Sequence, residues 1–472
     1  MVLLLLLLAA LWLAGGASRP NVAGQVISRA ASTVVLVVAI LFGQRPALLA
    51  QRAPLLLLAG AMALPLLQLV PLPPAWWQAL PGREVLARAA SLAGEAQPWR
   101  PLSMVPDATA NAAASLLVPA AVLLCLAGLR TGERLWLPTA MLVLIAASML
   151  VGLVQFSGSR FSQPLINYTY DVSGTFANRN HFAVWLALGC LVAPVWALAG
   201  NRRPAWRLPV ASGLLLLFVL TILSSGSRAG MAGAALALVL GPLIVREDLK
   251  RMLRGRPRWV LPAIMGGLLM LIALFVLLSI LLGRAVSVDR LIGEEVGRDM
   301  RSRGLPTVLA MISNYFPVGT GLGSFNPLFR LHEPFALLKL TYFNQAHNDY
   351  LGIALDAGLP GLLLMAVGLA WWAYASIAVW RGAGMGIREG RPVDLRQRQL
   401  RSAAGGSSEN GVDATTAAGR LGSAILLLLF LASVVDYPLR TPLMMAVAMV
   451  AACWLAWGAK WIRGASLPAG EH

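Results

Sequence analysis

Residues 347–380 read HNDYLGIALDAGLPGLLLMAVGLAWWAYASIAVW. A short polar head is followed by an apolar run that is long enough to cross a bilayer as a helix. Comparable runs recur along the whole chain, which is 58% hydrophobic and only 12% charged over 472 residues. Because backbone polar groups must be satisfied internally in lipid, we predict an all-α polytopic membrane protein.

Hydropathy predicts about twelve transmembrane helices. Their expected ranges are 2–16, 27–43, 54–72, 109–128, 134–156, 181–199, 208–224, 228–245, 259–283, 347–380, 421–436 and 441–463. The first run also resembles a secretory signal peptide with small residues near position 17. It lacks a basic start, which favours a retained span over a cleaved one.

Lysines and arginines lie in short clusters between the apolar runs, which explains the net charge of +18 by topology and anionic headgroups. We therefore expect membrane lipids, and not nucleic acid, as the partners of this charge. The loops that would be inside, if the N-terminus is cytoplasmic, carry more than twice as many basic residues as the short outer loops. This bias predicts that both termini are cytoplasmic.

Three connecting segments are too long to be simple turns. The outer segments are 73–108, which contains tryptophans and prolines, and 284–346, which joins the ninth and tenth spans. The inner segment 381–420 is poor in apolar residues and rich in Gly, Ser and Arg, so we predict a disordered loop there. We divide the chain into an N-terminal membrane part, 1–128, and a membrane core, 129–463.

Polar residues collect at four places that the predicted topology puts on the outer face. These are Asn178, Arg179, Asn180 and His181 before the sixth span, Arg228 in SSGSRAG, His347 at the tenth span, and Asp436 with Arg440 in SVVDYPLRTP. An arginine in a tight interfacial turn either has a charged partner or snorkels to headgroups. The three cysteines, in contrast, lie inside apolar runs, and we expect them to pack without forming a disulfide or a metal site.

The tenth span has helical spacing that would put His347, Tyr350, Gly358 and Gly361 on one face, with the glycines deeper in the membrane. Asp356 would lie about 13 Å below His347 at the helical rise per residue. A carboxylate at that depth needs a buried donor or a chemical role, and both interpretations stay open. For His347 itself, the alternative to a functional role is capping of the helix or a bond to a loop carbonyl.

Residues 316–325, FPVGTGLGSF, contain a glycine pattern that could suggest phosphate binding. No strand precedes it and no Gly-Lys-Ser follows, so it is a weak nucleotide motif. We expect the glycines to let the outer loop fold back tightly over the membrane face.

In combination, four motifs resemble the O-antigen ligase and polysaccharide polymerase family of bacterial envelope glycosyltransferases. In chain order they are GTFANRNHFA, SSGSRAG, PVGTGLGSF and HNDYLGIALDAGLPG, within residues 150–445. The most specific element is matched by His347, Asn348, Gly358 and Gly361. The resemblance implies a GT-C-like enzyme that moves a glycan from undecaprenyl pyrophosphate to an acceptor hydroxyl on the periplasmic face of the inner membrane.

The resemblance also suggests roles for the polar residues. Breaking the anomeric C–O bond develops negative charge on pyrophosphate, which fixed arginines would stabilise. Arg228 is the first candidate because it comes with the motif, and Arg440, Arg179 and Arg160 follow by position. His347 is the candidate general base, since histidine can accept a proton near neutral pH.

Three further residues, Asn348, Asn180 and Tyr350, are candidates for binding the glycan. The chain has no Asp-x-Asp sequence of the kind that holds a metal and a nucleotide sugar, so we expect metal-independent transfer without a cofactor. The acceptor could be lipid A core, a second lipid-linked glycan or a protein side chain. Ligase and polymerase activity are not separable from these motifs.

The alternative from another class is a transporter or flippase for lipid-linked glycans, since about twelve spans is a common transporter layout. Transporters usually bury ionisable groups near the midplane and repeat one half in the other. Here Asp356 is the clear deep acid and the two halves show no repeat, so transfer chemistry is favoured. A purely structural role would leave the four polar motifs without an explanation.

Overall fold

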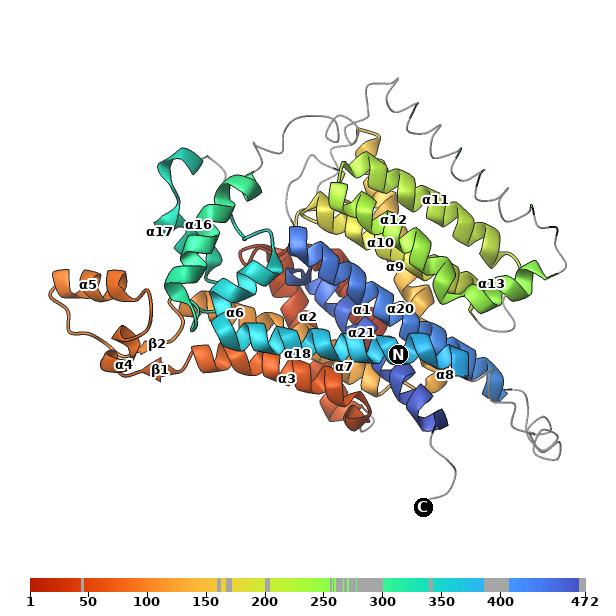
Figure 1. Ribbon diagram of the computed structural model, residues 1–472, viewed down its shortest axis with the longest axis horizontal. Helices are drawn as coiled ribbons and strands as arrows, with labels where there is room; N and C mark the ends of the chain where they lie inside the picture. Colours follow the sequence, from red (N-terminus) through yellow and green to blue (C-terminus); the bar gives the residue numbers. More distant parts are fainter. Residues whose placement is uncertain are drawn as a thin grey trace, which may run out of the picture.

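The computed structural model describes residues 1–43, 46–158, 163–166, 172–199, 204–254, 300–338, 343–385 and 407–466, with isolated positions between 255 and 299. Within these ranges the regular secondary structure is helical apart from one pair of short strands. The strands β1 (Pro71–Leu72) and β2 (Arg100–Pro101) pair antiparallel, with Leu72 opposite Arg100. Figure 1 shows a bundle of long helices with smaller elements at one end.

Nine helices or helix pairs of the described residues are long and apolar enough to cross a membrane. They are α2 (Ala23–Phe42), η1 with α3 (Leu48–Gln51, Arg52–Gln68), α6 with α7 (Pro106–Ser115, Leu117–Ala127), α8 with α9 (Thr131–Arg134, Leu137–Phe156), α10 (Arg179–Leu198), α11 (Arg207–Ser225), α18 (Asp349–Met385), α20 (Ser407–Val435) and α21 (Pro442–Ser466). The prediction of an all-α polytopic membrane protein is confirmed.

Three of the predicted spans need comment. Helix α12 (Arg228–Ile244) bends by 67° into α13 (Arg246–Leu253), and the two count as a tenth span if taken together. Helix α1 (Val2–Ala14) has 13 residues and is shorter than the range we expected, yet Leu4, Leu7, Leu8 and Leu11 are buried in the main core. The predicted span at 259–283 lies outside the described residues.

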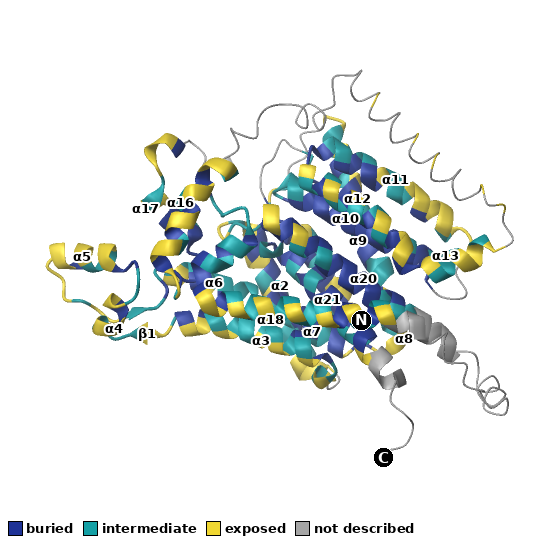
Figure 2. Ribbon diagram, in the orientation of Figure 1, coloured by how far each residue is buried: buried dark blue, intermediate teal, exposed yellow. Residues whose placement is uncertain are grey.

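Helix α10 is the most enclosed span, with 94% of its apolar window buried. It packs between α9, α11, α12 and α20, and Figure 2 shows α10 itself as largely buried ribbon. Glycines allow this close packing because a Cβ at Gly189 would meet Phe218 and a Cβ at Gly230 would collide with Ala183. Two of the cysteines, Cys190 and Cys453, are buried free thiols in this core, as expected.

A second, smaller core stabilises the elements beyond the membrane helices. Helices α16 (Met300–Tyr315) and α17 (Phe325–His332) and the turn η3 (Phe335–Leu337) form what we call the outer cap. Its buried residues are Val308, Met311, Tyr315, Phe325, Leu328, Phe329, Leu337, Phe343 and Leu355. Since Leu355 belongs to α18, this core attaches the outer cap to that helix.

The predicted continuous face on the tenth span was wrong, because Gly358 breaks α18. It has φ 56° and ψ −145°, a conformation that only glycine adopts easily, and a Cβ there would collide with the Pro317 carbonyl oxygen. The glycine loop supplies replacement hydrogen bonds: Gly321 N–H donates to Asp356 O at 2.8 Å, and Leu359 N–H donates to Pro317 O at 2.8 Å. The expected tight folding of this loop is confirmed.

The segment predicted as a disordered inner loop, 381–420, is helical at both ends. Helix α18 continues to Met385 and α20 begins at Ser407, whereas 386–406 lies outside the described residues. The extension of α20 is held by tertiary contacts, because a Cβ at Gly419 would lie only 3.0 Å from the Gly458 Cα and buried Arg420 donates to main-chain oxygens of α12 and α18. Local composition does not report such packing.

We predict that Gly358→Ala destabilises the protein by at least about 2 kcal/mol, because the new Cβ is both strained and in collision with the glycine loop. Thermal unfolding in detergent, followed by circular dichroism, measures this. The matched control is Gly368→Ala in the regular part of the same helix, where the Cβ would only contact Leu57 at 3.7 Å. Equal unfolding temperatures for the two variants would contradict the assigned role of Gly358.

Candidate functional site

Asp436 lies buried in the turn between α20 and α21 and is the centre of the polar residues at this end of the bundle. Its Oδ2 accepts hydrogen bonds from Asn180 Nδ2 at 2.8 Å and from Asn178 Nδ2 at 3.2 Å. Its Oδ1 lies 3.2 Å from His347 Nδ1 and 3.7 Å from His181 Nε2. The two predicted motifs around Asn180 and His347 therefore meet at one carboxylate.

The outer cap contributes a cation to the same carboxylate. Arg301 Nη2, on α16, lies 3.5 Å from Asp436 Oδ2, and Nη1 donates to the Val435 carbonyl at 2.9 Å. Burial alone would raise the pKa of Asp436, but hydrogen bonds from His181 and His347 outweigh it and hold that pKa well below its usual range. Asp436 is consequently a carboxylate at neutral pH.

His347 is held in an unusual backbone conformation. Its φ of 49° lies in the left-handed region, which non-glycine residues rarely occupy and which the surroundings must enforce. The ring centroid lies 4.9 Å from that of Tyr437 and 5.2 Å from that of Phe343. Since a carboxylate can only accept, the ring donates from Nδ1 to Asp436, and the lone pair of a neutral imidazole is then on Nε2.

A short chain of hydrogen bonds connects this centre to Ser227, the residue before Arg228. Asn180, which donates to Asp436, also accepts a hydrogen bond from Ser227 Oγ at 2.8 Å. Ser227 is the N-cap of α12, with its Oγ accepting from Gly230 N–H at 3.0 Å. The exposed Arg228 is the first residue of that helix, and Arg179 stands between the two asparagines that bind Asp436. Both arginines therefore border the centre.

Arg440 lies beside this centre but is bound to two other carboxylates. Its Nε lies 3.2 Å from Asp349 Oδ1 and its Nη1 lies 3.6 Å from Asp356 Oδ2. Asp349 also accepts from Ser433 Oγ at 2.9 Å. Of the two interpretations of Asp356, the structure supports the ion pair, because the side chain is fully buried and paired with Arg440.

The remaining candidates lie elsewhere. Asn348 caps α18, with its Oδ1 accepting from Leu351 N–H at 3.0 Å. Tyr350 donates from its hydroxyl to the Phe430 carbonyl at 3.0 Å and faces a cavity rather than Asp436. The candidate Arg160 lies outside the described residues.

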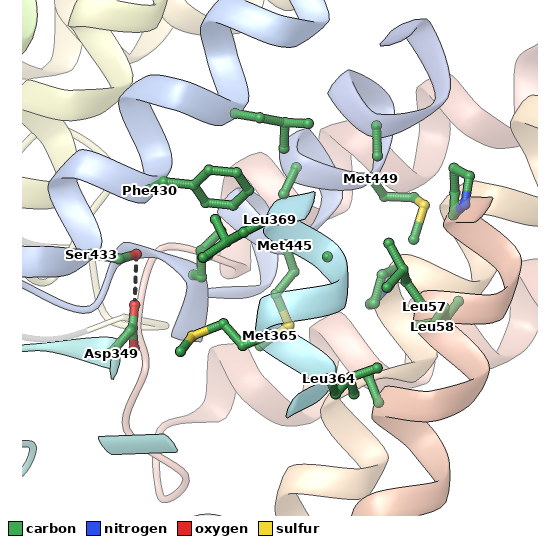
Figure 3. A pocket seen from close by; sticks show the side chains of 18 of the residues that line it. Leu57, Leu58, Asp349, Leu364, Met365, Leu369, Phe430, Ser433, Met445 and Met449 are labelled. Carbon is green, nitrogen blue, oxygen red and sulfur yellow. Dashed lines mark hydrogen bonds between the residues drawn. The ribbon is translucent and has the colours of Figure 1, made fainter. Parts of the chain in front are cut away.

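The cavity beside Asp349 has a volume of about 370 Å³ and is almost entirely apolar. Side chains from α3, α18, α20 and α21 line it, and Figure 3 shows Leu57, Met365, Leu369, Phe430, Met445 and Met449 around the space. The hydrogen bond between Ser433 and Asp349 marks its polar end. Its lining suits an apolar chain whose polar group is at that end.

Sequence reasoning missed the residue that organises the site. Asp436 was noted only as part of a polar turn, and Asn178, His181 and Arg301 were not selected as site residues. The available signal was the acid itself, because an aspartate in a tight turn between two apolar spans needs donors once it is buried. Arg301 gave no such signal, since its loop contains several arginines. Among the described residues, no three His, Cys, Asp or Glu side chains are grouped as metal ligands would be.

The fold and this site define a polytopic membrane protein with a histidine–carboxylate pair and arginines at one end of its bundle. Residues 213–366 match the family model described as O-antigen ligase. This match supports the O-antigen ligase and polymerase family that the motifs resemble, and with it a glycosyl-transferring, O-antigen ligase-like function. The matched residues include Arg228, Arg301 and His347. A search of curated proteins found no match.

We predict that Arg440→Ala destabilises the protein by about 3–5 kcal/mol, because it leaves two buried carboxylates without their cation. Thermal unfolding measures the loss, and Arg440→Lys, which retains the charge, should lose less. A normally stable but inactive Arg440→Ala variant would instead support the expected contact with substrate.

The lowered pKa of Asp436 predicts a pH-dependent contribution to stability. The ionised carboxylate stabilises the folded state at pH values above the ordinary aspartate pKa of about 4, and this contribution is lost as the pH falls below that value. The difference in unfolding temperature between wild type and Asp436→Asn should thus be largest at neutral pH and shrink on acidification. A difference that is constant from pH 7 to pH 3 would contradict this account.

Proposed function

We propose that the protein is a membrane glycosyltransferase of the periplasmic face of the bacterial inner membrane. It transfers a glycan from undecaprenyl pyrophosphate to an acceptor hydroxyl, as an O-antigen ligase or as an O-antigen or exopolysaccharide polymerase. The observation that carries this proposal is the His347–Asp436 pair, bordered by Arg228 and Arg301, within or next to the matched O-antigen ligase domain.

The pair has the arrangement that a general base needs. Asp436 accepts a hydrogen bond from the Nδ1–H group of His347 and so fixes the tautomer. Nε2 can then take the proton of the acceptor hydroxyl. The hydroxyl oxygen then forms a bond to the anomeric carbon while the C–O bond to the pyrophosphate breaks. The leaving group is undecaprenyl pyrophosphate, which departs with the electron pair of that bond.

Arginines stabilise the charge that develops on the leaving group. Arg228 at the start of α12 belongs to the bundle, and Arg301 on α16 belongs to the outer cap. Arg179 is a further candidate. We propose metal-independent transfer, in which these guanidinium groups supply the positive charge. Arg440, whose charge is matched by Asp349 and Asp356, holds the turn and α18 together.

The role that we propose for Asn180 differs from the glycan binding that the sequence suggested. Asn180 and Asn178 hold the Asp436 carboxylate, and we assign them to positioning the base. The apolar cavity beside Asp349 is a place for part of the polyprenyl chain of the donor. Since positively charged loops favour the cytoplasm, both termini are assigned to the cytoplasmic side.

We predict that His347→Ala lowers the transfer rate by about 10²–10⁴-fold, as loss of a general base does. Arg228→Ala and Arg301→Ala should each lower it by about 10²–10³-fold through lost stabilisation of the leaving group. Transfer of glycan from its lipid carrier, assayed with each variant in membrane vesicles after its insertion and folding are verified, measures these rates.

The matched control is Arg330→Ala, which removes an exposed arginine on α17 of the outer cap. Its activity should remain close to that of the wild type. Full activity of both His347→Ala and Arg228→Ala would overturn the proposed mechanism.

A further inference from the structure

Residues 71–101 form a separate projection that we call the outer lobe. It consists of β1, α4 (Pro74–Gln78), α5 (Glu84–Leu92) and β2. Figure 1 shows it beyond the end of α3, extending away from the helical bundle. The outer lobe lies outside the residues that match the O-antigen ligase model, 213–366, so the matched domain does not account for it.

The base of the outer lobe is fixed to the glycine loop. Arg83, which is fully buried, donates from Nη2 to the carbonyl oxygens of Leu102 and Gly319, both at 2.9 Å. Burial lowers the pKa of Arg83 to about 10, so it remains charged at neutral pH. Just below the lobe, Gln68 donates to Asp356 O at 3.0 Å and accepts from Leu322 N–H at 2.9 Å. The lobe is thereby attached to the loop that contacts Asp356.

The surface of the outer lobe exposes large apolar side chains on a rigid backbone. Trp76 is 69% exposed and Trp99 is 64% exposed. Their neighbour Trp77 is buried, donates from Nε1 to Pro101 O at 2.9 Å and has the Arg100 guanidinium 4.9 Å from its ring. The backbone that carries the two exposed tryptophans is held in place from below, which lowers the entropic cost of binding on them.

The position of the lobe relative to the membrane spans indicates which kind of ligand these tryptophans contact. Interfacial tryptophans belong at the ends of membrane spans, but this lobe extends away from the spans. Its accessible charges are mixed, with Glu84 and Glu95 balanced by Arg88 and the half-buried Arg100, so it does not select a strongly charged ligand. A ligand for this lobe is therefore neither a lipid nor strongly charged. A hydroxyl-rich sugar ring meets both conditions, because its C–H groups pack on the indole face while its hydroxyl groups stay in water.

We propose that the outer lobe binds a saccharide chain by stacking sugar rings on Trp76 and Trp99. This inference rests on the proposed function, because it makes the lobe the place where a segment of the glycan remote from the reacting hydroxyl is held. Binding energy gained at such a distance orients the reacting end. The two tryptophans are thus determinants of saccharide affinity and not catalytic residues.

The test uses the full-length protein in nanodiscs and, as the probe, lipid-free polysaccharide released by mild acid from envelope glycolipids of the producing strain. Trp76→Ala together with Trp99→Ala should weaken saccharide binding about tenfold, because two stacking contacts are lost. Replacing both by Phe should retain part of the affinity. The control Trp136→Ala removes an equally exposed tryptophan outside the lobe, and its affinity should stay unchanged.

In the transfer assay, the same double alanine variant should raise the KM for the acceptor or donor glycan and leave kcat nearly unchanged. Saccharide binding that is equal in wild type and double variant overturns the proposal, even if the wild type transfers glycan normally. Cross-linking of the lobe to a protein, together with unchanged saccharide binding, would also overturn it. If the wild type binds saccharide but transfers no glycan, and the double variant loses binding, saccharide binding by the lobe would be supported and the proposed function refuted.

Discussion

The structure of the site depends on the burial of one carboxylate, Asp436. A charge in a medium of low polarity is costly unless donors surround it, so the turn that carries it can pack only where donors converge. The start of α10, the residues before α18 and the first turn of α16 each provide at least one. The need of the Asp436 carboxylate for donors therefore brings together segments that are remote in sequence. The same carboxylate orients the imidazole of His347.

A second buried ion pair couples the membrane helices to the outer cap. Arg440 binds Asp349 and Asp356, which lie about two turns apart on α18, and Asp356 also accepts from the Gly323 N–H of the glycine loop at 3.1 Å. This arrangement requires the break at Gly358, which lets the loop approach the helix. It also pairs Asp356 with a cation, so this acid is not an uncompensated charge of the kind that an ion-coupled transporter would use.

The site crosses the boundary of the matched domain. Arg228, Arg301 and His347 lie within residues 213–366, whereas the carboxylate and the asparagines that hold it lie on either side. The residues proposed for chemistry and the residues that position them are thus contributed by different parts of the chain. The outer lobe lies before the matched residues in the sequence, although it contacts the glycine loop in space. It adds exposed tryptophans that suit glycan binding but take no part in the reaction.

The sequence by itself determined the membrane class, most of the spans and the polar motifs, because apolar runs in lipid have to form helices and each motif is local. It also placed His347 and Arg228 in the motifs of a known family. Only the tertiary structure decided the partners: Asp436 as the centre, Arg440 in a buried ion pair, Asn348 as a helix cap and Tyr350 at the apolar cavity. The ordered start of α20 depends likewise on packing against α21. Side chains separated by 89 or 256 positions meet through the fold, and hydropathy and spacing carry no information about such pairs.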